Sequence, residues 1–88
     1  MALHNRGLSK LIEEAGEVLQ VAGKLQAYPD GDHPDGGKDL HLRLEEELAD
    51  LYAAMKVVEM KFQLNRRAIS VRAIRKAEQF LRWSNEDT

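Results

Sequence analysis

The sequence predicts an all-α protein, a small antiparallel bundle of about three helices that oligomerisation completes. Apolar residues recur at the three-and-four spacing of amphipathic helices in three segments. The one long break in this pattern contains two Pro-Asp-Gly turns, and no segment shows the strict alternation typical of a half-buried strand. With 88 residues, the chain is expected to form one domain covering positions 1–88.

The first helix is expected over residues 7–27. Its apolar positions are Leu8, Leu11, Ile12, Ala15, Val18, Leu19, Ala22 and Leu25. A loop is expected over 28–39, because Pro29-Asp30-Gly31 and Pro34-Asp35-Gly36 each combine a fixed φ, a side-chain acceptor and a residue with free φ.

The second helix is expected over residues 40–64 and the third over 66–83. The apolar stripe of the second helix consists of Leu44, Leu48, Leu51, Tyr52, Met55, Val58 and Phe62. Asn65 suits the N-cap of the third helix, which places Ile69, Ala73, Ala77, Phe80 and Leu81 on one side. The polar residues 84–88 are expected to form a frayed tail.

Composition excludes several classes of protein. A net charge of -2 argues against a nucleic-acid partner held by phosphate contacts, and the absence of cysteine excludes disulfides and thiolate zinc sites. No apolar run approaches the roughly 20 residues that span a bilayer, and the N-terminal residues lack the apolar core of a signal peptide. We therefore expect a cytoplasmic protein without nucleic-acid or membrane partners.

Two acidic pairs are the strongest functional signal. Glu14 and Glu17 in the first helix, and Glu47 and Asp50 in the second, are each spaced i, i+3. A rotation of about 100° per residue places both pairs at the borders of the apolar stripes, where two antiparallel helices would bring them together. Carboxylate oxygens are the ligands that Mg²⁺ prefers in proteins, so the pattern predicts a divalent-metal site.

A structural interpretation competes with the metal site. Lys10 with Glu14, and Arg43 with Glu47, have the i, i+4 spacing of ordinary helix-surface ion pairs. Two pairs that border apolar stripes in consecutive helices weaken this interpretation. Clustered carboxylates repel each other without a cation, which makes them a poor device for stability.

The residues that carry these pairs resemble a known family. The segments Lys10-Leu11-Ile12-Glu13-Glu14-Ala15-Gly16-Glu17-Val18 and Leu44-Glu45-Glu46-Glu47-Leu48-Ala49-Asp50-Leu51 are similar to the ExxE and ExxD motifs of the MazG-like all-α nucleotide pyrophosphohydrolases. That superfamily includes the dimeric dUTPases and phosphoribosyl-ATP pyrophosphohydrolase. The resemblance extends over about residues 9–83.

The resemblance implies a Mg²⁺-dependent enzyme that hydrolyses a nucleoside triphosphate to the monophosphate and pyrophosphate, with Mn²⁺ able to replace Mg²⁺. It assigns Glu14, Glu17, Glu47 and Asp50 as metal ligands, and it implies a homodimer or homotetramer. A phosphoribosyl-ATP-type activity is the alternative within the superfamily. Many members have a further helix before ExxE, so here the cover over the nucleotide is expected from the loop 28–39 or from a neighbouring subunit.

The remaining roles follow from the charges. A carboxylate left free by the metal would accept the proton of the attacking water; Glu17 is the first candidate for this base, with Glu13 and Glu46 as alternatives. Lys61, Arg72 and Lys76 are candidates for binding the phosphates, although surface cations often serve only solubility. Tyr28 and Trp83 suit stacking on a base, but a terminal tryptophan beside an aromatic residue is more often part of a core or an interface.

Two other classes of protein compete with the hydrolase. An inactive helical interaction module would keep the bundle and use its surface for a partner. A di-iron bundle is disfavoured, because such sites usually contain Glu-x-x-His and neither acidic pair supplies a histidine.

Overall fold

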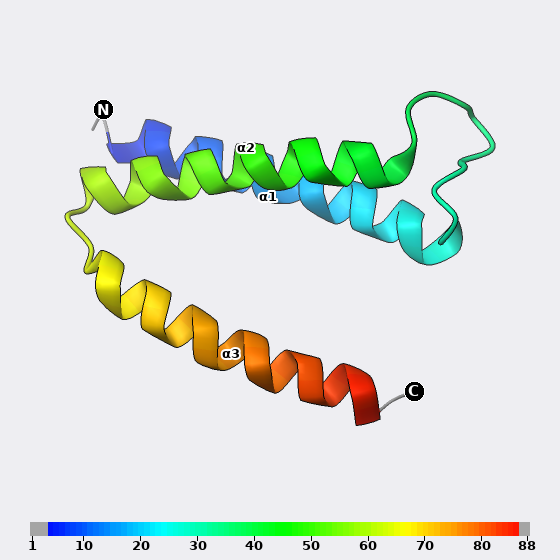
Figure 1. Cartoon of the computed structure of the whole chain (residues 1–88). Helices are drawn as coiled ribbons and strands as arrows, with labels where there is room; N and C mark the ends of the chain where they lie inside the picture. Colours follow the sequence, from blue (N-terminus) through cyan, green and yellow to red (C-terminus); the bar gives the residue numbers. More distant parts are fainter. Residues whose placement is uncertain (1–3, 87–88) are drawn as a thin grey trace.

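The computed structural model describes residues 4–86, and within that range the chain forms three helices and no strand. They are α1 (His4–Ala27), α2 (Leu40–Lys61) and α3 (Arg66–Glu86) (Figure 1). The prediction of an all-α helical bundle is confirmed. None of the helices in this range combines the length and the apolarity that a membrane span needs.

Helices α1 and α2 form an antiparallel pair that stays in contact along its length (Figure 1). The buried apolar residues in the described range all belong to this pair, and they are Val21, Leu40, Ala54 and Val58. Small residues bring the two helices close together. A Cβ atom added to the buried Gly7 would lie 3.2 Å from the Lys61 side chain.

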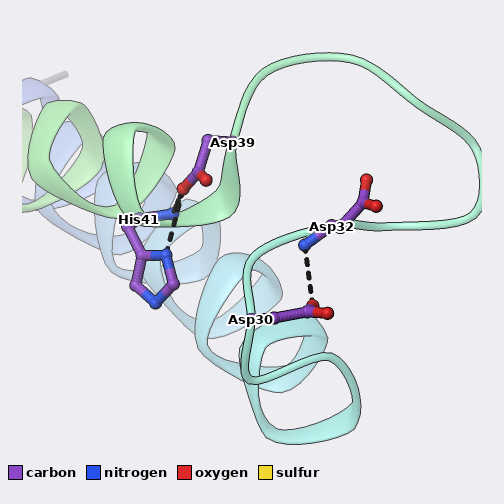
Figure 2. A network of polar contacts seen from close by, with 4 residues as sticks. All are labelled: Asp30, Asp32, Asp39 and His41. Carbon is purple, nitrogen blue, oxygen red and sulfur yellow. Dashed lines mark hydrogen bonds and ion pairs between the residues drawn. The ribbon is translucent and has the colours of Figure 1, made fainter.

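The loop 28–39 ends in a cap that starts α2. A carboxylate oxygen of Asp39 accepts a hydrogen bond of 2.7 Å from the His41 backbone N–H and lies 3.0 Å from Nδ1 of the His41 ring (Figure 2). The backbone N–H bond is the main reason that the pKa of Asp39 lies below its usual value. Gly31 packs against this cap with φ at 88°, and any Cβ there would lie 2.6 Å from the His41 ring. Only glycine fits that position.

The boundaries of the helices differ from the sequence prediction by a few residues. α2 ends at Lys61 rather than 64, because the chain reverses with Gln63 at a φ of 52°. Asn65 caps α3 as predicted, its side-chain oxygen accepting a 2.9 Å hydrogen bond from the Ala68 N–H. The residues expected to fray remain helical as far as Glu86, and positions 87 and 88 lie outside the described residues.

The apolar stripe of α1 is only partly buried by α2. Val21 and the carboxylate-bearing Glu14 lie in the interface, whereas Ile12 and Leu19 are each 72% exposed. The arc of α1 that faces α2 is therefore not centred on the apolar stripe predicted from the sequence. The buried positions of α1 in the described part of the chain are Gly7, Glu14 and Val21, which share one face at a spacing of seven residues, and none of them belongs to that stripe.

Helix α3 stands apart from the pair. It makes no more than isolated contacts with α1 or α2, and Figure 1 shows it diverging from them after the short turn at residues 62–65. Its large apolar residues remain exposed, and they are Val71, Ile74, Phe80, Leu81 and Trp83.

Candidate metal site between α1 and α2

Three of the four predicted carboxylates meet between the antiparallel helices. Glu14 comes from α1, and Glu47 and Asp50 come from one turn of α2. One carboxylate oxygen from each residue lies within 4.8 Å of the other two. Glu14 is 8% exposed, which is unusual for a carboxylate on a two-helix surface.

The cluster is electrostatically strained at Glu47. Partial loss of contact with water raises the pKa of Glu47, and the negative charges of Glu17, Asp50 and Glu14 raise it further. Arg43 offsets part of this effect, but no ion pair between Arg43 and Glu47 is formed in the described part of the chain. The second of the two competing surface ion pairs is therefore not formed.

Glu17 lies beside the cluster rather than in it. It does not belong to the group of three carboxylates, although its charge is the largest electrostatic contribution to the raised pKa of Glu47. The geometry thus separates three candidate ligands from one neighbouring carboxylate. A neighbour of this kind is what a proton acceptor next to a metal site requires.

The positively charged side chain of Lys10 lies at the edge of the carboxylate cluster. Its Nζ lies 3.1 Å from a carboxylate oxygen of the nearly buried Glu14 and 3.4 Å from the exposed Glu13. Hydrogen bonds to Glu14 and then Glu13 raise the pKa of Lys10. The Lys10 to Glu14 ion pair that the sequence suggested is therefore formed, and it places a positive group at the edge of the carboxylate cluster.

A pocket of about 500 Å³ opens next to these carboxylates. Its walls come from the first three turns of α1 and from residues 50–61 of α2. They consist of Arg6, Gly7, Lys10, Glu14, Asp50, Ala53, Ala54, Val57 and Lys61. Two carboxylates and three cations thus share one cavity, with small side chains between them.

The predicted phosphate-binding residues divide between two places. Lys61 lines the pocket beside the carboxylates, whereas Arg72 and Lys76 line a separate pocket of about 190 Å³ on α3. Sequence reasoning missed Arg6 as a pocket residue and treated Lys10 only as an ion-pair partner. The signal was available, because both residues lie on the face of α1 that bears Glu14, one and two turns earlier.

The other candidates have partners elsewhere. Glu13 pairs with Lys10, and Glu46 pairs with Lys38 at 2.7 Å. The Tyr28 ring packs edge-on against the His33 ring, with ring centroids 4.9 Å apart. Trp83 packs against Phe80, with a centroid separation of 5.4 Å. None of these residues lines the pocket.

The donor set decides which cations suit the site. Three carboxylates without histidine or cysteine offer only hard oxygen ligands, which favour Mg²⁺, Mn²⁺ or Ca²⁺ over zinc or copper. The open pocket leaves space for water and for oxygen atoms of a ligand, which Mg²⁺ usually retains in its coordination shell. The residues present therefore fit the hard divalent cation expected from the sequence.

Comparisons of this chain with models of protein families, with curated proteins and with solved structures give no match.

Proposed function

We propose that this protein is a Mg²⁺-dependent nucleotide pyrophosphohydrolase that cleaves a nucleoside triphosphate to the monophosphate and pyrophosphate. One observation carries the proposal. Three carboxylates from two helices converge, and two of them, Glu14 and Asp50, line a pocket that also presents Arg6, Lys10 and Lys61. Carboxylates that could hold a metal ion thus lie next to positively charged side chains. This arrangement suits a ligand that is itself a metal ion bound to a polyanion.

Glu14, Glu47 and Asp50 would hold the divalent cation. When bound, the cation supplies neutralisation of phosphate charge and polarisation of water. The raised pKa of Glu47 means that this carboxylate gains more than an exposed one from a nearby positive charge. Glu14, on α1, is largely shielded from water, so its carboxylate also interacts more strongly with a nearby cation than an exposed carboxylate would.

Lys61, Lys10 and Arg6 would bind the phosphates. They lie in the same pocket as Glu14 and Asp50, so a phosphate chain extending from the carboxylates meets positive groups. Lys10 has a double role, since it is paired with Glu14 and would turn towards phosphate oxygens when the cation takes over that carboxylate. Arg72 and Lys76, on α3, would reach this pocket only from another copy of the chain.

Glu17 would accept the proton. Water adds to one phosphorus of the α–β anhydride, the bridging P–O bond breaks, and the water proton passes to the Glu17 carboxylate. The product on the other side of the bridging oxygen leaves with the electron pair of the broken bond, as pyrophosphate after attack at the α-phosphorus or as the monophosphate after attack at the β-phosphorus, and the base then returns its proton to solvent. Glu17 suits this role because it lies close enough to influence Glu47 without belonging to the three-carboxylate group.

The test is a panel of nucleotides with the purified protein and Mg²⁺. The panel contains ribo-, deoxyribo- and modified nucleoside triphosphates together with phosphoribosyl-ATP, which tests the alternative activity of the superfamily. We expect release of pyrophosphate from at least one compound and its loss in EDTA. Inactivity across the whole panel would instead favour a helical interaction module.

Direct metal binding provides a second readout. A cation that binds only the folded state raises the melting temperature in proportion to the logarithm of its concentration. Mg²⁺ or Mn²⁺ should therefore stabilise the wild-type chain and should stabilise Glu47→Gln much less. Equal stabilisation of both proteins would show that the three carboxylates are not the metal site.

The expected cytoplasmic location belongs to this proposal and is tested by fractionation of the source cells.

A further inference from the structure

Lys10 and Lys61 are held in the pocket in different ways. The Nζ atom of Lys10 lies 3.1 Å from a carboxylate oxygen of Glu14, so an ion pair fixes the end of this side chain. Lys61 lines the same pocket but forms no ion pair with a carboxylate in the described part of the chain. A lysine side chain without a partner samples many rotamers, and ordering it costs conformational entropy. Packing rather than charge therefore decides where Lys61 lies.

The end of α2 fixes the backbone of Lys61. This lysine is the last residue of α2, and backbone hydrogen bonds close the helix directly after it. The Phe62 N–H donates to the Val58 carbonyl at 3.0 Å. The Leu64 N–H donates to the Glu59 carbonyl, also at 3.0 Å. Because helical geometry sets the direction in which a side chain leaves the backbone, these bonds also orient the first bond of the Lys61 side chain.

The Lys61 side chain extends along the pocket. Side chains of an α-helix tilt towards its N-terminus, so Lys61 covers the preceding turn, which contains Val57. The pocket residues Val57, Ala54 and Asp50 precede Lys61 on one face of α2, at intervals of four, three and four residues. The side chain therefore tilts towards the end of the pocket that carries Asp50.

Gly7 leaves the space in which the methylene chain of Lys61 lies. Gly7 is buried, and a Cβ atom added to it would lie 3.2 Å from Cδ and 4.0 Å from Cε of Lys61. The next neighbour, Cγ2 of Val58, would lie 3.8 Å away. A separation of 3.2 Å is shorter than the optimal carbon–carbon distance of about 3.5–4.0 Å, so Lys61 would have to move.

The other two glycines of α1 leave no such space for a neighbour. A Cβ atom added to Gly16 or Gly23 would have no atom of another residue's packing surface within 4 Å. Glycine inside a helix lowers stability relative to alanine, because its backbone loses more conformational freedom on folding. Of the three glycines, Gly7 is the one whose missing side chain admits a neighbouring side chain.

We propose that Gly7 is a positioning residue, which holds the methylene chain of Lys61 against α1 and so directs its ammonium group to the phosphates of the ligand. This inference rests on the proposed function, because it takes Lys61 as a phosphate-binding group. Gly7 acts only through Lys61. A side chain that is already held loses less conformational entropy when it binds a ligand.

The first experiment measures binding of inorganic pyrophosphate in the presence of Mg²⁺ by titration calorimetry. Gly7→Ala should weaken binding about threefold, because the displaced Lys61 side chain must be ordered again when the ligand binds. Lys61→Ala should weaken binding about fivefold, because the contact itself is lost. Gly23→Ala is the matched control. It adds the same Cβ atom to the same helix in open space and should leave binding unchanged.

A double-mutant cycle tests whether Gly7 acts through Lys61. The double variant Gly7→Ala/Lys61→Ala should bind pyrophosphate as Lys61→Ala does, because no methylene chain remains to be displaced. Additive losses would overturn the proposal, since Gly7 would then shape the pocket independently of Lys61. Unchanged binding by Gly7→Ala would also overturn it, as would a wild-type protein that binds no pyrophosphate.

A second measurement observes the side chain without any ligand. In protein with ¹³C-enriched lysine, the ε-methylene signal of Lys61 is identified by its absence from the spectrum of Lys61→Ala. This signal should shift in Gly7→Ala and stay in place in Gly23→Ala. An unchanged signal in Gly7→Ala would show that Lys61 does not pack on Gly7. Alanine favours a helix more than glycine does, so neither variant should lose helix content, and circular dichroism checks this.

These measurements separate the role of Gly7 from the proposed hydrolysis. If binding and the Lys61 signal change as expected while no nucleotide of the panel is cleaved, the proposed function fails and the role of Gly7 stands. If nucleotides are cleaved while Gly7→Ala binds pyrophosphate as tightly as the wild type, only the role of Gly7 fails.

Discussion

The α1/α2 pair and α3 are built from the same kind of amphipathic sequence, yet they end in opposite situations. The pair contains the buried apolar residues of the described range and a cluster of acids, whereas α3 is basic and keeps its large apolar residues exposed. The difference teaches that helical periodicity specifies a face to be buried but does not specify its partner.

The same lesson holds inside α1. Its interface with α2 contains Glu14 and Val21, while the more apolar positions Ile12 and Leu19 face outwards. Packing that places a carboxylate between helices and leaves leucine and isoleucine outside is costly for stability alone. It is reasonable if the carboxylate binds a cation and the apolar residues bind a protein.

The largest expected effect concerns the carboxylate cluster between α1 and α2. Glu47→Gln should lower the proposed activity roughly 10²–10³-fold, because it removes one charge that positions the reacting groups. Glu45→Gln, on an exposed position of the same helix, is the matched control and should retain activity. If both variants lose activity equally, or if neither does, the convergence of carboxylates has no catalytic meaning.

The melting temperature of Glu47→Gln at different pH values tests the repulsion between the clustered carboxylates. The pKa of Glu47 is raised in the folded protein above its ordinary value of 4.5, so ionisation of this carboxylate destabilises the fold. Without metal, Glu47→Gln should match or exceed the wild-type melting temperature at neutral pH. This advantage should disappear below pH 4.5, where both folded and unfolded wild-type chains are protonated. A loss of stability at neutral pH would mean that Glu47 is a structural ion-pair partner.

Two valines compare the packed and the unpacked helices directly. Val21, fully buried in α1, should lose about 2 kcal/mol of unfolding free energy when changed to alanine. Val71, 40% exposed on α3, should lose less than about 0.5 kcal/mol after the same change. Denaturant titrations provide both values. Equal losses would indicate that α3 is as firmly packed as α1 in solution.

The cap of α2 gives an effect of intermediate size. Asp39→Ala removes the acceptor for the His41 N–H and should lower the melting temperature by roughly 4–8 °C. Asp39→Asn keeps a side-chain oxygen and should lose less. Because the pKa of Asp39 is lowered, the contribution of its charge is present at neutral pH and is lost as pH falls through that lowered pKa. If neither substitution changes the melting temperature, the Asp39 cap does not stabilise the start of α2.

The smallest effect distinguishes the two groups of cations. Lys61→Ala should raise KM about fivefold with a smaller change in kcat, because it removes a phosphate contact in the pocket. Arg72→Ala, in the separate pocket on α3, should change KM less. A larger effect of Arg72 in steady-state assays would show that α3 of another copy reaches the pocket.

Much of this arrangement was predictable because it depends on local chemistry. The loop 28–39 follows from its Pro-Asp-Gly turns, the start of α3 from Asn65, and the meeting of Glu14 with Glu47 and Asp50 from i, i+3 spacing on adjacent helices. The roles of Lys10 and Arg6 at the pocket were harder to predict. They depend on which arc of α1 faces α2, and apolar residues alone indicated a different arc.

The sequence by itself determined three helices, their connecting turns and two acidic pairs, because backbone preferences and i, i+3 spacing act within a few residues. Tertiary structure decided that Glu14 faces α2, that Glu17 lies beside the carboxylate group, and that α3 leaves the pair. Those outcomes depend on how closely Gly7 and Ala54 let two helices approach and on the hydrogen bonds of one turn. Such contacts join residues far apart in the chain, and no local pattern contains them.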